Sequence, residues 1–287
     1  MNRIVMHAHA KINLGLEVLQ KRPDGYHDIQ SVFVPLGLHD VITIEPAETL
    51  SVVCTPEVTS IPEENLVWKA AIAASAAAGN QRCGAKITVE KHIPAGGGLG
   101  GGSSDAAATI LGLNTMFSWN LSATVLHNLA CSLGSDVPFF LQSFPAIVSG
   151  RGDVVVPIDI HIPWTFVLVF PGISVSTPWA YGQLGRTESY PQSTKISEES
   201  LKSLVNKDVR ELTITNDFES VVFARYPELA VIKQDLINIG ALAAWMSGSG
   251  STMVGLFAAP PSPEVVTQGI RYPHHVTRAL SFRNSPR

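Results

Sequence analysis

Six of the seven residues from Gly96 to Gly102 are glycine, and Leu99 is the exception. A predicted strand precedes this loop, and Ser103 and Ser104 follow it at the start of a predicted helix. A backbone without Cβ atoms can adopt positive φ angles and press its N–H groups against a ligand, while the N-terminus of the next helix adds partial positive charge. This arrangement suits a phosphate chain. The alternative interpretation is a flexible hinge.

The spacing of the glycines excludes one common phosphate loop and weakens a second. A P-loop requires G-x-x-x-x-G-K-[ST], and no lysine follows any of these glycines. Gly96, Gly98 and Gly101 do fit G-x-G-x-x-G, but a dinucleotide site also expects an acidic residue about 20 residues later. The stretch 106–135 contains no Asp or Glu. The loop therefore predicts phosphate binding outside both classes.

Two charged residues could act on a ligand bound at such a loop, one as a proton acceptor and one as a source of positive charge. Asp136 precedes V-P-F-F and could act as the base, or it could cap a helix as the structural alternative. Lys11 lies in an apolar predicted strand, where a cation is costly unless it is paired. The alternative for Lys11 is a side chain that extends its amine into solvent.

Tyr26 and His27 follow the Asp24-Gly25 turn, at the rim of a predicted hairpin. A tyrosine there can stack on a pyrimidine, and a histidine can hydrogen-bond its edge. Stacking of a base on an aromatic ring is worth about 1–3 kcal/mol. The alternative is that the pair simply begins a strand.

Composition bounds the class of protein. The chain has 287 residues, enough for two domains of about 150 residues or for one large domain. With 24 acidic residues, 20 Lys plus Arg and a net charge of −4, it lacks the basic excess of a protein that coats nucleic acid. No apolar run approaches the roughly 20 residues that cross a bilayer, so a membrane-embedded protein is excluded as well.

The cysteines bear on the compartment. Cys54, Cys83 and Cys131 lie far apart and form no C-x-x-C motif, which argues against both a disulfide framework and a thiolate zinc site. The first residues hold no apolar block long enough for a secretory signal. We therefore expect reduced thiols and a cytoplasmic protein.

Apolar periodicity and turn residues predict a mixture of strands and helices. The predicted strands are 10–19, 27–34, 41–45, 51–54, 85–93, 165–170 and 252–257. The predicted helices are 65–78, one capped by Ser103 or Ser104 that reaches Phe117, one that begins after Ser122 and ends at Gly134, and 198–205, 217–225 and 228–239. We expect turns over 172–194, a solvated surface from Arg271 onward, and a domain border between Asp153 and Pro171.

Six segments together resemble the GHMP kinases, which include galactokinase and the homoserine, mevalonate and phosphomevalonate kinases. The segments are AHAKINLGL (8–16), RPDGYH (22–27), PAGGGLGGGSSDAA (94–107), LGSDVPFF (133–140), PGISVSTPWAY (171–181) and SGSGSTM (247–253). They are most similar to the branch that uses ATP to phosphorylate the 2-hydroxyl of a cytidine-diphosphate-linked methylerythritol in non-mevalonate isoprenoid synthesis. Two alternatives remain open: a kinase of the homoserine or mevalonate type, and a nucleotide-binding regulator without catalysis.

The resemblance implies an α+β, two-domain GHMP kinase fold with the active site in the cleft between the domains. Residues 1–160 would form the N-terminal ATP-binding domain and residues 161–287 the C-terminal domain. The implied ligands are ATP, with Mg²⁺ held mainly by its phosphates and by water because no carboxylate cluster offers a cage, and a small-molecule substrate. No protein metal site, nucleic acid or membrane is implied, and the sequence leaves open a monomer or a homodimer.

The resemblance also implies a role for each site residue. Lys11 and Asp136 would be the catalytic pair. The ATP phosphates would lie against Pro94, Ala95, Gly96, Gly97, Gly98, Leu99, Gly100, Gly101, Gly102, Ser103 and Ser104, with Asn65 and Leu66 at the adenine. The alcohol substrate would contact Asn13, Tyr26, His27, Thr177 and Tyr181. A helix cap and a core leucine are the alternatives for Asn65 and Leu66, and the segment from Ser247 to Ser251 would support the phosphates or form a simple tight turn.

Overall fold

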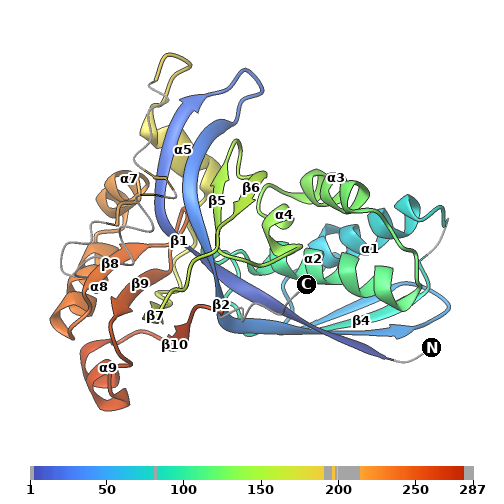
Figure 1. Ribbon diagram of the computed structural model, residues 1–287. Helices are drawn as coiled ribbons and strands as arrows, with labels where there is room; N and C mark the ends of the chain where they lie inside the picture. The colour runs from blue at the N-terminus through green and yellow to red at the C-terminus, as the bar shows by residue number, and fades with distance from the viewer. Residues whose placement is uncertain (1–2, 81–82, 191–195, 198, 200–213, 281–287) are drawn as a thin grey trace. The chain divides into compact units, whose positions relative to one another are not determined.

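The computed structural model describes residues 3–80, 83–190, 196–197, 199 and 214–280, and within them helices and strands are mixed, which confirms the α+β prediction (Figure 1). The chain divides into two compact units. The first unit contains residues 1–10, 38–95 and 100–143, and the second contains residues 11–37, 96–99 and 144–287. The domain division between residues 160 and 161 remains a prediction, since compactness divides the chain at other places.

The strands of the first unit come from the two ends of a long hairpin and from the chain that follows it. Strand β1 (Ile4–Lys21) pairs with β2 (His27–Pro46), and β2 pairs antiparallel with β4 (Ala85–Glu90). Strand β3 (Ser51–Thr55) runs parallel to β4. The predicted strands 27–34 and 41–45 both lie within β2, which continues through the residues between them, where Leu36 and Leu38 are buried.

Helices cover the strands of the first unit. They are η1 (Pro62–Glu64), α1 (Leu66–Ala77), α2 (Gly101–Met116), α3 (Ala123–Leu133) and α4 (Val137–Phe140). Ile42, Ile87 and Leu113 belong to the buried cluster that joins strands to helices. Helices α1 and α2 pack along each other, and α3 contacts both.

The caps of two helices confirm the sequence prediction. The side chain of Asn65 accepts a hydrogen bond from the backbone N–H of Val67 at the start of α1. Ser122 caps α3 in the same way, and Gly134 ends that helix. Val125 is exposed (37%), since buried Leu129 and Ala130 define the inner face of α3.

The predicted cap of α2 was wrong. The helix begins at Gly101, so Ser103 and Ser104 lie within its first turn, and Ser104 is buried. Gly100 occupies the cap position with a left-handed φ of 71° and without a capping side chain. This conformation is one that glycine adopts at little cost, so the helix can begin three residues earlier than a cap at Ser103 would allow.

The second unit contains a four-stranded antiparallel sheet with the strand order β10-β7-β9-β8. These strands are β7 (Thr165–Val169), β8 (Ala243–Met246), β9 (Met253–Phe257) and β10 (His274–Arg278). Two further strands extend the sheet beside β2: β5 (Ala146–Ser149) pairs antiparallel with β2, and β6 (Val154–Pro157) pairs antiparallel with β5. The helices of this unit are α5 (Thr177–Leu184), α7 (Glu219–Arg225), α8 (Glu228–Asn238) and α9 (Pro263–Gly269).

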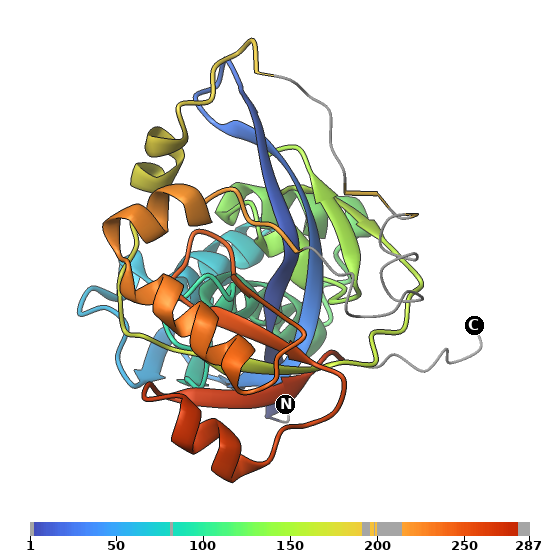
Figure 2. The same ribbon diagram turned by 90° about the vertical axis from the view of Figure 1, so that its left-hand side faces the viewer.

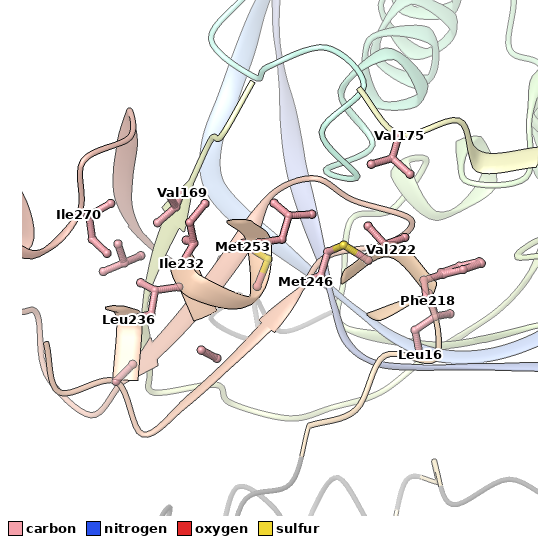
Figure 3. Packing of buried hydrophobic residues seen from close by; sticks show 14 of the residues in the cluster. Leu16, Val169, Val175, Phe218, Val222, Ile232, Leu236, Met246, Met253 and Ile270 are labelled. Carbon is pink, nitrogen blue, oxygen red and sulfur yellow. The ribbon is translucent and has the colours of Figure 1, made fainter. Parts of the chain in front are cut away.

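The core of the second unit lies between this sheet and its helices. Helix α8 packs on β8 and β9, as Figure 2 shows. Figure 3 shows the buried cluster, in which Val169, Met246 and Met253 come from strands and Val222 and Leu236 come from helices. This packing fixes the loop that joins β8 to β9, because both of its flanking strands are fully buried.

Two segments contain elements that the sequence did not predict. The stretch 172–194 contains α5, which Ser176 caps and whose first turn contains Pro178. The tail after Arg271 contains β10, which pairs with β7 and buries Thr277, while Arg271, His275 and Arg278 are exposed, as a solvated surface requires. The predicted helix 198–205 lies outside the described residues, apart from position 199. In the described part of the chain, no helix has the length and apolar character needed to cross a membrane.

Candidate active site

The glycine loop has an unusual backbone. Gly96, Gly98 and Gly100 have φ angles of 69°, 78° and 71°, so every second residue is left-handed. Side chains rarely tolerate this conformation, which explains glycine at these three positions. Alternation of left-handed and ordinary residues turns successive N–H groups toward one side and creates a local concavity for anions.

A second glycine-rich segment, Ser247 to Ser251, packs directly on this loop. A Cβ atom on Gly98 would lie 2.1 Å from the carbonyl oxygen of Ser247, so no side chain fits there. The hydroxyl of Ser247 donates to the carbonyl oxygen of Gly98 (3.1 Å), and the N–H of Thr252 donates to that of Gly97 (3.2 Å). The structure thus brings together two motifs that are about 150 residues apart in the sequence.

Asn216, which the sequence did not single out, holds this second segment in place. Its side-chain N–H groups donate to the carbonyl oxygens of Met246 and Gly248, each at 2.7 Å. Its Oδ1 accepts from the N–H of Phe218 (2.9 Å). Because the buried side chain of Asn216 makes these three hydrogen bonds, it holds the backbone of the segment from Ser247 to Ser251 in one conformation. The sequence offered no signal, because Asn216 resembles an ordinary turn residue there.

Lys11 and Asn13 lie on the same face of β1, because residues two apart in a strand point to the same side. Lys11 is only 3% exposed, so the alternative of a lysine that reaches solvent is wrong. Its Nζ donates to Asn13 Oδ1 (2.8 Å) and lies 4.3 Å from the centroid of the Phe33 ring. Asn13 in turn donates to the hydroxyl of Ser31 (2.9 Å). The N–H of Lys11 donates to the carbonyl oxygen of Leu99 (2.9 Å), which ties β1 to the glycine loop.

Asp136 belongs to the first unit and precedes the buried helix α4. Its side chain does not cap this helix, although Pro138 in the first turn favours a helix start there. Asp136 therefore stands at the cap position of α4, but its side chain does not act as a helix cap.

The aromatic residues form a stack from β2 and α5. The rings of His27 and Tyr181 stack with centroids 5.0 Å apart, and Tyr181 meets Phe218 edge to face at 4.8 Å. Burial lowers the pKa of His27, which favours the neutral imidazole. Tyr26 is 54% exposed and lies beneath the guanidinium of Arg151, 4.9 Å from its ring centroid.

Three further predicted residues have identifiable surroundings. The hydroxyls of Thr177 and Ser249 are 2.7 Å apart, which connects α5 to the loop between β8 and β9. Asn65 does act as a helix cap, and its Nδ2 also donates to the sulfur of Cys54 (3.2 Å). Leu66 is half-buried rather than a core residue.

The sequence did not single out three charged residues that lie near the glycine loop. Lys91 lies between Asp40 and Asp105, with its Nζ 2.5 Å and 2.6 Å from their carboxylates. Burial lowers the pKa of Lys91, but the two carboxylates outweigh it and the pKa is raised. The pKa of Asp105 is raised to about 7. Burial is the main cause, the charge of Asp40 raises the pKa further, and the charge of Lys91 lowers it in part. No sequence pattern joins residues so far apart.

Among the described residues, no group of three or more His, Cys, Asp and Glu could hold a metal ion. The ammonium of Lys91 lies between the carboxylates of Asp40 and Asp105, and an ammonium at that position competes with a cation. The donor set therefore does not fit a dedicated protein site for Mg²⁺.

Two family models match the chain: one for the GHMP kinases N terminal domain, over residues 65–143, and one for the GHMP kinases C terminal domain, over residues 198–272. A protein from Thermodesulfovibrio yellowstonii named 4-diphosphocytidyl-2-C-methyl-D-erythritol kinase is 42% identical over 254 residues, which are 87% of this chain and 88% of that protein. A protein of the same name from Chlorobium luteolum is 40% identical over 284 residues, covering 96% and 97% of the two chains.

Solved structures give the same picture. A crystal structure of 4-(cytidine 5'-diphospho)-2C-methyl-D-erythritol kinase matches with a TM-score of 0.78 and 32% identity, covering 96% of this chain and 98% of that one. The homoserine kinase of Cytophaga hutchinsonii matches with a TM-score of 0.67 and 16% identity, covering 97% and 95%. At that identity the second match shows a common fold alone.

Asp105 makes the stability of the protein depend on pH. Folding raises its pKa from the ordinary 3.8 to about 7, so between these values the folded protein holds a proton that the unfolded chain releases. The stability from this group is complete below about pH 4 and is lost as the pH rises through 7, with a slope of at most about 1.4 kcal/mol per pH unit. We expect urea unfolding to show that the free energy of unfolding of the wild type falls relative to that of Asp105→Asn from pH 5 to pH 7. This relative change should level off above about pH 8. Parallel pH profiles for the two proteins would contradict this assignment.

Proposed function

This chain belongs to the GHMP kinases, and within them to the 4-diphosphocytidyl-2-C-methyl-D-erythritol kinases, and on that basis we propose that it phosphorylates the 2-hydroxyl of that alcohol with ATP. The observation that carries the proposal is the 40% identity with a relative of that name over 96% of this chain. The reaction is a step of non-mevalonate isoprenoid synthesis. The weaker likeness to a homoserine kinase concerns the fold alone.

We assign the ATP phosphates to the glycine loop and to the start of α2. The left-handed residues Gly96, Gly98 and Gly100 support this assignment, because their N–H groups can face one anion. Helix α2 has 16 residues, and its N-terminal N–H groups carry partial positive charge. Gly102 supports it as well: a Cβ there would meet no protein atom within 4 Å, so packing in the free protein does not require glycine at that position.

In the proposed reaction, Asp136 accepts the proton of the substrate hydroxyl. The hydroxyl oxygen attacks the γ-phosphorus, the bond to the bridging oxygen breaks, and ADP leaves with the electron pair. Lys11 supplies positive charge, and its hydrogen bond to Asn13 holds the ammonium in one orientation. Mg²⁺ would arrive with ATP and take most of its ligands from phosphates and water, in keeping with the lack of a protein cage in the described residues.

The cytidine end of the substrate is assigned to Tyr26, His27 and Tyr181. The stacked rings of His27 and Tyr181 support this assignment, since they present a flat aromatic surface beside exposed Tyr26. We assign Asn13 and Thr177 to the polar part of the substrate. Cys54 and Cys83 are free thiols, which supports a cytoplasmic location.

An ADP-release assay tests the activity directly. We expect release when ATP is supplied with 4-diphosphocytidyl-2-C-methyl-D-erythritol, and little with homoserine or mevalonate, because neither offers a base to stack on the aromatic residues. A higher kcat/KM with homoserine or mevalonate would favour the alternative kinase types. ADP release with none of the three alcohols would favour a regulator.

Replacement of the proposed base should affect catalysis alone. Asp136→Asn keeps the size of the side chain but cannot accept the proton, so we expect turnover to fall by about 10² to 10⁴. ATP affinity, measured by calorimetry, should stay within a factor of about three, because the loop is untouched. Asp159→Asn is the matched control, since Asp159 is exposed and outside the site. Turnover within a few-fold of the wild type would rule out Asp136 as the base.

A substitution at Gly102 should affect ATP binding without lowering the stability of the fold. In Gly102→Ala we expect the free energy of unfolding to stay level or to rise by about 0.5–1 kcal/mol, because alanine favours a helix. The KM for ATP should nevertheless rise about tenfold or more, because the methyl group enters the space assigned to phosphate. Gly182→Ala in α5 is the control, since its Cβ would also meet no neighbour within 4 Å. An unchanged KM in Gly102→Ala would contradict the phosphate assignment.

A further inference from the structure

Lys91, Asp40 and Asp105 form a buried charge cluster at the two chain ends of the glycine loop. Lys91 comes directly after β4, three residues before Pro94, and Asp105 follows the loop in the second turn of α2. The side chains of Lys91, Asp40 and Asp105 are 7%, 0% and 6% exposed. The ammonium of Lys91, from the segment that leads into the loop, therefore contacts Asp105, from the helix that follows the loop, with 2.6 Å between Nζ and Oδ2.

Asp40 extends this connection into the backbone. Its Oδ2 accepts from Lys91, and its Oδ1 accepts from the N–H groups of His92 and Ile93 at 2.5 Å and 2.8 Å. These two N–H groups belong to the residues that lead from β4 into the loop. A single buried carboxylate thus fixes both the lysine and the path of the chain that enters the loop.

The two ends of the loop also touch. A Cβ on Gly101, the first residue of α2, would lie 2.9 Å from Cγ2 of Ile93 and 3.5 Å from Nζ of Lys91. The beginning of α2 therefore rests against the residues that Asp40 holds. The glycines between the two ends have no side chains with which to fix the shape of the loop.

We propose that Lys91, Asp40 and Asp105 act as a loop clamp, a set of positioning residues that fixes the glycine loop in the shape that binds the ATP phosphates. This inference rests on the proposed function for its ligand. The clamp does not touch the reacting atoms; it acts by keeping the exit of β4 and the start of α2 at a fixed separation.

The charges of the clamp point to a role beyond stability. Two carboxylates surround one ammonium, and Oδ1 of Asp105 has no hydrogen-bond partner in the described part of the chain. A buried ion pair is often no better for stability than apolar residues of the same volume. Its geometry, in contrast, is directional, because each hydrogen bond fixes the position of a particular segment of backbone.

The closing experiment compares Asp105→Ala, Asp105→Asn and Lys91→Met with Lys86→Met. Asn retains an oxygen that can accept from Lys91, whereas Ala does not. Lys86 is the control because it lies on β4, the strand that Lys91 follows, and its described ion pair, with Glu45 at 4.0 Å, is exposed. Hydrogen–deuterium exchange of peptides that cover residues 94–104 in the ligand-free protein reports on the loop itself. The KM for ATP and the KM for the alcohol report on binding.

In Asp105→Ala and Lys91→Met we expect the loop amides to exchange about tenfold faster and the KM for ATP to rise about tenfold, with the KM for the alcohol within about twofold. Asp105→Asn should stay within about threefold of the wild type in both readouts, and Lys86→Met should match the wild type. If Lys91→Met does not fold, the two Asp105 variants decide the question.

Equal behaviour of Asp105→Ala and Asp105→Asn, or unchanged loop exchange in Asp105→Ala, would overturn the clamp. A wild-type enzyme that released no ADP with any alcohol would instead contradict the proposed function. In that case the exchange comparison would still test the clamp, because it needs no ligand.

Discussion

The backbone of Gly98 passes so close to the carbonyl oxygen of Ser247 that a single methyl group would separate them. Several contacts within the second unit depend on this approach. The hydroxyl of Ser247 donates to Gly98 and accepts a weaker hydrogen bond from the N–H of Asn13 (3.4 Å). Trp245 adds a bond from its indole N–H to the carbonyl oxygen of Asn13 (2.7 Å). The glycine loop, β1 and the end of β8 are thereby held in register, and Lys11 takes its position from them.

Lys91 and Lys11 both have buried side chains, and their described contacts position them. Lys91 lies between the carboxylates of Asp40 and Asp105, and Asp40 also accepts from the backbone N–H groups of His92 and Ile93, an arrangement that resists movement. Lys11 donates to the amide oxygen of Asn13 and lies over the face of Phe33. These contacts orient the ammonium of Lys11, which suits a group that is proposed to act on phosphate.

Local rules predicted those parts of the fold whose partners are near in sequence. Asn65 and Ser122 cap their helices because a side-chain oxygen reaches an N–H two or three residues ahead. The same rules failed where tertiary contacts override them. Gly100, with a left-handed backbone, replaces a serine as the start of α2, and β10 is ordered because β7 offers it an open edge.

For the site, the sequence by itself determined which atoms are absent and which chemistry is present: a backbone from Gly96 to Gly102 that carries no side chain except that of Leu99, one lysine in an apolar strand, and motifs typical of one kinase family. Those features are properties of composition and short spacing. Only the tertiary structure decided what holds them, namely Asn216 under the second glycine segment, Arg151 over Tyr26, and Lys91 between Asp40 and Asp105. Hydrogen bonds and ion pairs act over a few ångströms, so residues 50 or 150 positions apart acquire a common role only when the chain has folded.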